Sequence, residues 1–142
     1  APAAAGPPAR ADGDSLLLEA HADRVTSLPG LQGELGGVHF AGYASVYGDA
    51  NPRPAGAEDE EIFYWFVGRT GADYKTQPTI LWTNGGPGST SFWGFFTENG
   101  PYVVEGTKDE PVLKPRPHAW NDFANYMILE HPLGVTFSYE SS

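Results

Sequence analysis

The sequence predicts an α/β fold in which a β-hairpin and parallel strands share one mixed sheet. An alternating stretch at 36–49 and an aromatic-rich stretch at 61–69 together predict the hairpin. Short apolar stretches at 79–82 and 125–134 predict two buried strands, with a helical stretch between them. This order of elements predicts a mixed sheet with a parallel part. One helix cannot cover both faces of such a sheet, so the predicted fold is incomplete.

The beginning of the chain differs in composition from the rest. Residues 1–22 are rich in Ala, Pro and Gly and lack periodicity, which predicts a disordered or loosely attached arm before a domain at 23–142. The pattern SLLLEAHADRV, at 15–25, is compatible with a short helix. The chain opens with Ala1 rather than Met, so we expect either a removed leader or a fragment.

The predicted hairpin is half-buried. In GGVHFAGYASVYGD, at 36–49, successive side chains alternate between two faces. The connection NPRPAGAEDE, at 51–60, leads into an acidic run from Glu58 to Glu61 that we interpret as a solvated surface. The stretch EIFYWFVGR, at 61–69, then returns as the second strand.

The remaining elements follow the hairpin in order. TILW, at 79–82, is continuously apolar, which is typical of a central strand covered on both faces. STSFWGFFTENG, at 89–100, predicts a short helix with a hydroxyl residue available as its cap. The stretch 100–122 predicts a loop with two short strands, and NYMILEHPLG, at 125–134, predicts a second buried strand.

Composition excludes several classes of protein. The formal net charge of −10 argues against a nucleic-acid binder, which would carry a basic face. No apolar run reaches the length of about 18 residues that a membrane span needs. Without cysteine, the chain can form no disulfide, thiolate metal site or cysteine nucleophile. No pair of its four histidines has the spacing of metal ligands, so we expect neither a metal nor another cofactor.

The glycine-rich turn in ILWTNGGPGSTS, at 80–91, is the strongest local signal for function. Three interpretations are open. It could bind phosphate at a helix N-terminus, although the usual glycine motifs and a nearby lysine are missing. It could be a purely structural turn, stiffened by Pro87. It could also form an oxyanion hole, in which free backbone N–H groups point at a developing negative oxygen.

Longer matches make one interpretation specific. WTNGGPGSTSFWGFFTENGP resembles the signature of the serine carboxypeptidases, which belong to the α/β-hydrolase superfamily. The segments RVTSLPG, FAGYASV, IFYWFV and HAWNDFANYMILEHPLGVTFSY resemble further family segments in the same order. The match covers about Arg24 to Tyr139 and implies the N-terminal part of an α/β-hydrolase fold, with a β-hairpin and parallel strands of a central mixed sheet.

The resemblance implies a role for five residues. Gly86 would give its N–H to the oxyanion hole. Gly85 would lie where the C-terminal carboxylate of the substrate is held, and the Asn84 side chain would donate a hydrogen bond to that carboxylate. Glu98 would take part in the same site with a second glutamate beside the nucleophile, and Trp82 would belong to the same network. Since two close carboxyl groups cannot both ionise cheaply, such a site should favour acidic pH.

Each assignment has a structural alternative. Trp82 could be a core aromatic, Asn84 a turn residue and Glu98 a solvated helix residue. The family cysteine is replaced by Ser89, so the disulfide that it normally forms is impossible here. Trp93, on the predicted helix, is placed where it could line the substrate pocket and alter side-chain preference.

The sequence lacks the nucleophile that the family requires. No G-x-S-x-G elbow is present, and none of the four histidines matches the catalytic one. The resemblance thus implies a secreted, vacuolar or lysosomal carboxypeptidase acting on peptides with a free C-terminal carboxylate. This chain would supply the oxyanion loop, and the remaining C-terminal part of the enzyme would supply the Ser-Asp-His triad. The alternatives are a non-catalytic interaction module, and an acyltransferase or hydroxynitrile lyase on the same scaffold.

Overall fold

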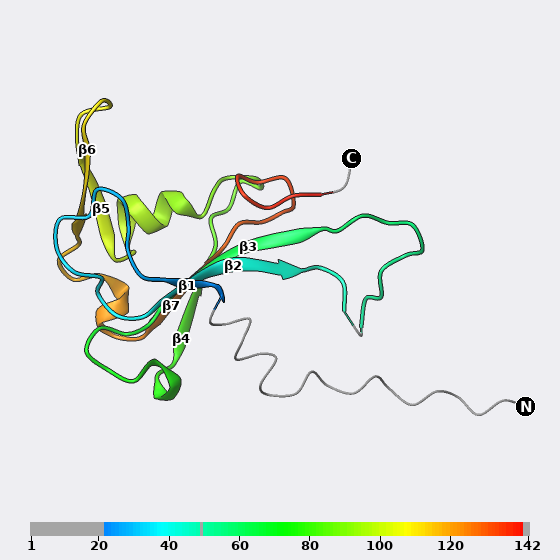
Figure 1. Cartoon of the computed structure of the whole chain (residues 1–142), viewed down its shortest axis with the longest axis horizontal. Helices are drawn as coiled ribbons and strands as arrows, with labels where there is room; N and C mark the ends of the chain where they lie inside the picture. The colour runs from blue at the N-terminus through cyan, green and yellow to red at the C-terminus, as the bar shows by residue number, and fades with distance from the viewer. Residues whose placement is uncertain (1–21, 49, 141–142) are drawn as a thin grey trace, which may run out of the picture.

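The computed structural model describes residues 22–48 and 50–140 (Figure 1). Strands β2 (His39–Ser45) and β3 (Glu61–Val67) form the predicted antiparallel hairpin, and the short strand β1 (Arg24–Val25) pairs with the outer edge of β2. The predicted arm lies almost entirely outside the described residues. Most of the predicted helix at its end does so too, and its last two residues form β1 rather than helix.

The five-stranded sheet is mixed. Strand β7 (Asn125–Leu129) lies between β3 and β4 (Thr79–Trp82), which gives the order β1-β2-β3-β7-β4. β7 is antiparallel to β3 and parallel to β4, with Leu81 opposite Met127. The α/β fold with a hairpin and a parallel strand pair is therefore confirmed.

The prediction that residues 79–82 form a central strand was wrong for the part of the chain described. β4 is the edge of the sheet, paired only with β7, and Leu81 is 56 % exposed. β7 is instead an interior strand, paired with β3 and β4, and its Tyr126 and Ile128 are fully buried. A continuous apolar run indicates that both faces of a strand need apolar contacts, but it does not identify the neighbouring strand.

A second, smaller sheet projects from the body of the molecule (Figure 1). It consists of the antiparallel strands β5 (Tyr102–Gly106) and β6 (Pro111–Pro115), which agrees with the two short strands predicted in this region. The connection at 51–60 is largely exposed, as expected of a solvated surface. Two short 3₁₀ turns, η1 (Tyr74–Thr76) and η3 (Trp120–Asp122), precede β4 and β7.

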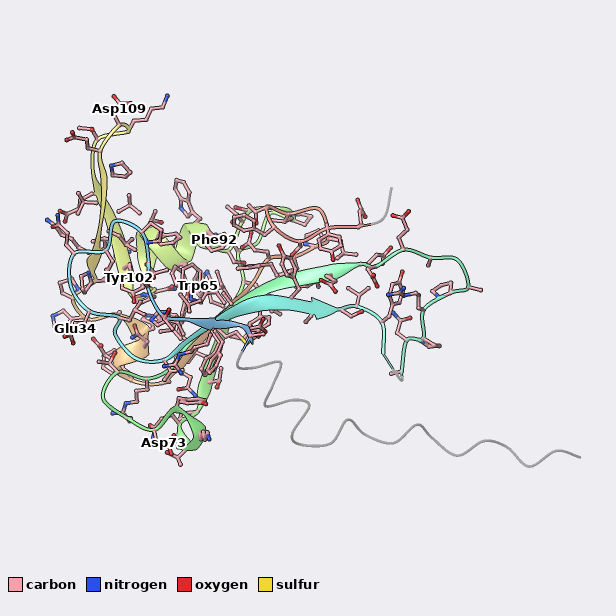
Figure 2. The ribbon with its side chains drawn as sticks, viewed as in Figure 1. Glu34, Trp65, Asp73, Phe92, Tyr102 and Asp109 are labelled. Atoms are coloured by element: carbon pink, nitrogen blue, oxygen red, sulfur yellow. The ribbon has the colours of Figure 1, made fainter. Side chains whose placement is uncertain are left out.

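The predicted helix spans residues 92–98 and lies over one face of the sheet. Its second part, η2 (Gly94–Glu98), has π-helical geometry, and the Asn99 N–H donates to the Gly94 carbonyl oxygen over 3.0 Å. Aromatic rings fill the space between helix and sheet, and Figure 2 labels Trp65 and Phe92 among them. The ring centroid of Trp65 lies 4.7 Å from that of Phe95 and 6.1 Å from that of Phe92. This aromatic layer fixes the helix on the sheet directly after the glycine-rich turn.

A buried histidine joins the five-stranded sheet to the smaller sheet of β5 and β6. His39 is fully buried, its Nδ1 accepts a hydrogen bond from the Trp65 indole over 3.1 Å, and its Nε2 lies 3.0 Å from the Tyr102 hydroxyl. Since Nδ1 accepts, Nε2 carries the proton of a neutral ring. Burial, with a smaller contribution from Arg24, lowers the pKa of His39 to about 4. It is therefore a residue of the core.

Candidate functional site

The glycine-rich turn connects β4 to the helix and exposes its backbone. Residues 85–89 are all exposed. Gly86 has φ of 137° and Gly88 has φ of 92°, a region that side chains other than glycine rarely adopt. A Cβ on Gly86 would also lie 3.2 Å from the Ser89 nitrogen, whereas the space around Gly85 is open. The turn thus needs glycine at 86 and 88 and leaves room for a ligand at 85.

The orientation of the Asn84 side chain is set by its neighbour Trp82. The Trp82 indole N–H donates to Asn84 Oδ1 over 2.8 Å. Because the oxygen of the amide is engaged, its Nδ2 group remains as a donor, and no residue in the described part of the chain accepts from it. An outward amide donor next to exposed backbone N–H groups can bind an anionic oxygen at any pH.

The helix approaches this pair so closely that only glycine fits. A Cβ on Gly94 would lie 2.3 Å from Trp82 Nε1 and 3.1 Å from Asn84 Oδ1. Gly94 is therefore a site residue that the sequence analysis did not identify. The available signal was a glycine inside a predicted helix, which often marks close packing.

Glu98 and Trp93 are both on the helix, and both side chains are exposed. Burial, and after it the negative charge of Glu98, raises the pKa of Tyr126. That hydroxyl donates to Asn99 Oδ1 over 2.6 Å. Trp93 is 60 % exposed. Its backbone N–H donates to the carbonyl oxygen of Thr90, which directly follows the turn.

A third tryptophan, Trp120, was absent from the sequence-based set and lies between Trp82 and Tyr126. The Trp120 ring lies edge-on to Trp82 at 5.5 Å and edge-on to Tyr126 at 6.3 Å. Trp82, Asn84 and the adjoining glycines therefore form one group, and Trp120 connects this group to Tyr126, whose hydroxyl binds Asn99 directly after Glu98. The structure brings Trp82 and Asn84 into direct contact, whereas Trp93 stands apart on the exposed surface of the helix.

The end of β7 holds both ends of the turn. The backbone N–H of Asn84 donates to Ser91 Oγ over 3.2 Å, and the Ser91 hydroxyl donates to the Leu129 carbonyl oxygen over 2.6 Å. The next residue, Glu130, is fully buried, and its carboxylate accepts the Ser91 N–H over 2.6 Å. Neither Ser91 nor Glu130 was predicted to belong to the site, because their contacts join positions about 40 residues apart.

Metal and membrane sites are not evident in the described ranges. In residues 22–48 and 50–140, no three His, Asp or Glu side chains form a group able to hold a metal ion. In the same ranges, no helix has both the length and the apolar character needed to cross a membrane.

Comparison with known proteins gives one consistent family. The family model described as serine carboxypeptidase matches residues 29–142. The chain is 40 % identical over 122 residues to serine carboxypeptidase-like 45 of Arabidopsis thaliana, covering 85 % of this chain and 23 % of that protein. It is 36 % identical over 117 residues to the lysosomal protective protein of Mus musculus, covering 82 % and 22 %.

A solved structure agrees with the sequence relatives. The chain is similar to Kex1, a prohormone-processing carboxypeptidase from Saccharomyces cerevisiae, with a TM-score of 0.61 and 25 % identity. The similarity covers 75 % of this chain and 21 % of the yeast one. The chain thus spans less than a quarter of the length of each of these three proteins.

Proposed function

The chain belongs to the serine carboxypeptidase family, and from this premise we propose that it provides the oxyanion loop and the C-terminal carboxylate site of a peptidase. The enzyme would release C-terminal residues from peptides through an acyl-enzyme. The observation that carries the proposal is the hydrogen bond from Trp82 to Asn84, which leaves the Asn84 amide as an outward donor beside the exposed glycine turn.

In this proposal Gly86 stabilises the transition state. Its exposed N–H lies on a turn whose φ of 137° requires glycine, so the direction of the N–H is fixed by the backbone before substrate binds. A preorganised N–H of this kind stabilises the negative oxygen that develops when a nucleophile attacks a peptide carbonyl. An oxyanion hole donor typically contributes a factor of about 10² to 10³ in kcat.

Asn84 and Gly85 would hold the terminal carboxylate of the peptide. The Nδ2 group of Asn84 donates one hydrogen bond, and the open space around Gly85 admits the carboxylate close to the backbone. Glu98 would take part from the helix, beside a second carboxyl group from another part of the protein. A preference for acidic pH would depend on that second group, because one of two neighbouring carboxyl groups must keep its proton to donate to the substrate.

The rest of the same protein would supply the nucleophile, aspartate and histidine. This sequence contains no G-x-S-x-G elbow. The exposed edge of β4 supports a partner of this kind, since Leu81 and the strand backbone have no neighbour on that side within the described part of the chain. An apolar groove of about 510 Å³ beside the helix, lined by residues such as Phe63, Phe92 and Phe137, supports it as well. We expect the isolated chain to be inactive.

We also propose a secreted, vacuolar or lysosomal location. The support is one relative whose name states that it is lysosomal, together with the acidic composition of the chain. A fluorescent fusion of the full-length protein that followed endosomal markers would agree with this proposal, and a uniformly cytosolic one would contradict it.

The decisive experiment compares two substrates with the full-length protein. An N-blocked dipeptide with a free carboxylate should be cleaved, and the same dipeptide with a C-terminal amide should not. Asn84→Ala should raise the KM for the free acid by about tenfold, because a hydrogen bond to a charged group is lost. The control is Gln32→Ala, which removes an exposed amide outside the site.

Three other results would favour one of the alternative functions. A protein that labels with a fluorophosphonate but transfers acyl groups without cleaving peptides would be an acyltransferase. Lyase activity on a hydroxynitrile would place it with the lyases. A full-length protein that neither labels nor cleaves would be a non-catalytic interaction module.

A further inference from the structure

We propose that Glu130 is a positioning residue, which holds the oxyanion loop in its working geometry by anchoring the first turn of the following helix. This inference rests on the proposed function, because it assigns the loop its catalytic purpose. Glu130 itself would not contact the substrate. It acts through Thr90, Ser91 and Phe92, the residues that follow the glycine-rich turn.

The Glu130 carboxylate is fully buried and accepts hydrogen bonds at both oxygens. One oxygen, Oε1, accepts the backbone N–H of Ser91 over 2.6 Å and that of Phe92 over 3.2 Å. The other, Oε2, accepts the Thr90 hydroxyl over 2.7 Å and the Thr136 hydroxyl. Four donors from two segments therefore converge on one side chain. Such a group is costly to bury without its partners and stable with them.

Glu130 reinforces a local cap at the start of the helix. The first N–H groups of a helix have no partner within it, and a negative charge near them is favourable. The Thr90 hydroxyl accepts the Phe92 N–H over 3.2 Å, as the sequence predicted for a hydroxyl cap. The same hydroxyl donates to Glu130, so the local cap is itself fixed from the end of β7.

The loop between these anchors has little support of its own. Residues 85–89 are exposed and, within the described part of the chain, make no hydrogen bond to another element. Their position is therefore determined by the two ends of the loop. Asn84 is held by Trp82 and by Ser91 Oγ, and the other end is held by Glu130. Releasing the Glu130 end should let Gly86 move while Asn84 stays in place.

Because Glu130 and Trp82 hold different parts of the site, loss of the Glu130 anchor should affect kcat and KM differently. Losing the Glu130 anchor should lower kcat, since the oxyanion N–H is displaced in the transition state. The KM for a free-carboxylate peptide should change little, because Trp82 and the Ser91 hydroxyl still hold Asn84. A merely structural residue would lower the amount of folded enzyme without this split.

The test uses three variants of the full-length protein. Glu130→Met keeps the length of the side chain and removes both acceptors. Glu130→Gln keeps one oxygen for the two N–H groups, and its NH₂ group can donate to the two threonine hydroxyls. Ser138→Ala is the matched control, because Ser138 is 3 % exposed and binds the backbone carbonyl of Glu130 and the N–H of Phe63, not the turn.

The first measurement is steady-state hydrolysis of a free-carboxylate dipeptide. For Glu130→Met we expect kcat to fall by about tenfold or more, with KM within about threefold of the wild type. Glu130→Gln should restore most of kcat, and Ser138→Ala should keep kcat for the folded fraction. Equal kcat in Glu130→Met and wild type would overturn the inference.

The second measurement does not depend on activity. Amide hydrogen exchange over residues 91–98 should become faster in Glu130→Met and remain slow in Ser138→Ala, because Glu130 accepts the first two N–H groups of this segment. Unchanged exchange in Glu130→Met would refute the anchoring role even if peptide hydrolysis had never been detected. Conversely, faster exchange in Glu130→Met, combined with a wild-type protein that cleaves no peptide, would support the anchor and reject the proposed function.

A milder variant covers the case in which Glu130→Met does not fold. Thr90→Val removes one hydroxyl donor to Glu130 together with the local acceptor of the Phe92 N–H. We expect a smaller fall in kcat and faster exchange over the same segment. If Thr90→Val matches wild type in both measurements, the anchor has no effect on the loop.

Discussion

The indole N–H of Trp82 donates to Oδ1 of Asn84 over 2.8 Å, and this contact determines which end of the amide faces outward. Without it, the amide oxygen could turn toward the ligand position and repel a carboxylate. The role proposed for Asn84 therefore depends on a tryptophan that does not itself reach the ligand. Gly94 and Trp120 pack against the same indole and hold it in place.

Removing the indole donor should weaken carboxylate binding. In Trp82→Phe we expect KM for a free-carboxylate peptide to rise by about three- to tenfold, with kcat nearly unchanged, because one neutral hydrogen bond is lost. A double-mutant cycle with Asn84→Ala checks the route of the effect by steady-state kinetics. The two changes should be far from additive, and additive losses would show that Trp82 does not act through Asn84.

Gly94→Ala should destabilise the protein, which is opposite to the usual effect of this change within a helix. Alanine normally stabilises a helix relative to glycine by about 0.5–1 kcal/mol. Here its Cβ would lie 2.3 Å from Trp82 Nε1, and we expect a loss of about 1–3 kcal/mol from overpacking. Urea unfolding of the full-length protein measures this loss. Gly48→Ala is the control, since that glycine has open space around it.

The buried His39 should make stability depend on pH. Its pKa is lowered to about 4 in the folded protein, against an ordinary value of 6.5, so only the unfolded chain takes up this proton between these values. The free energy of unfolding should therefore fall as pH drops from 6.5 to about 4, by about 3 kcal/mol at most from this residue.

Urea unfolding at a series of pH values measures this dependence. His39→Leu should be less stable at neutral pH, because Trp65 and Tyr102 lose their partner, and it should show a shallower decline in acid. If both proteins lost the same free energy between pH 6.5 and 4, His39 would not be the source.

The exposed edge of β4 should make the isolated 142-residue chain associate. Leu81 is 56 % exposed on a strand with no partner on its outer side in the described part of the chain, and open strand edges pair with other chains. Leu81→Lys should reduce the association measured by sedimentation velocity at micromolar concentration. An isolated chain that remained monomeric without this change would contradict the expectation.

Local patterns were sufficient to predict most elements of the fold. Alternation at 36–49 and aromatic enrichment at 61–69 predicted the hairpin, and the apolar stretch at 125–134 predicted a buried strand. These patterns are informative because the apolar and polar residues of a strand indicate which of its faces are buried. In the described part of the chain β4 lies at the edge rather than at the predicted centre, since strand order depends on which distant segment pairs with it.

The sequence by itself determined the glycine-rich turn and, through its resemblance to a family, the residues around which a carboxylate site would form. Only the tertiary structure decided the orientation of Asn84, the close approach of Gly94 and the anchoring of the turn by Glu130. Backbone freedom at glycine is a property of single residues and is visible in a sequence. A hydrogen bond between Ser91 and Glu130 joins segments 39 residues apart and exists only after β7 has been inserted beside β4.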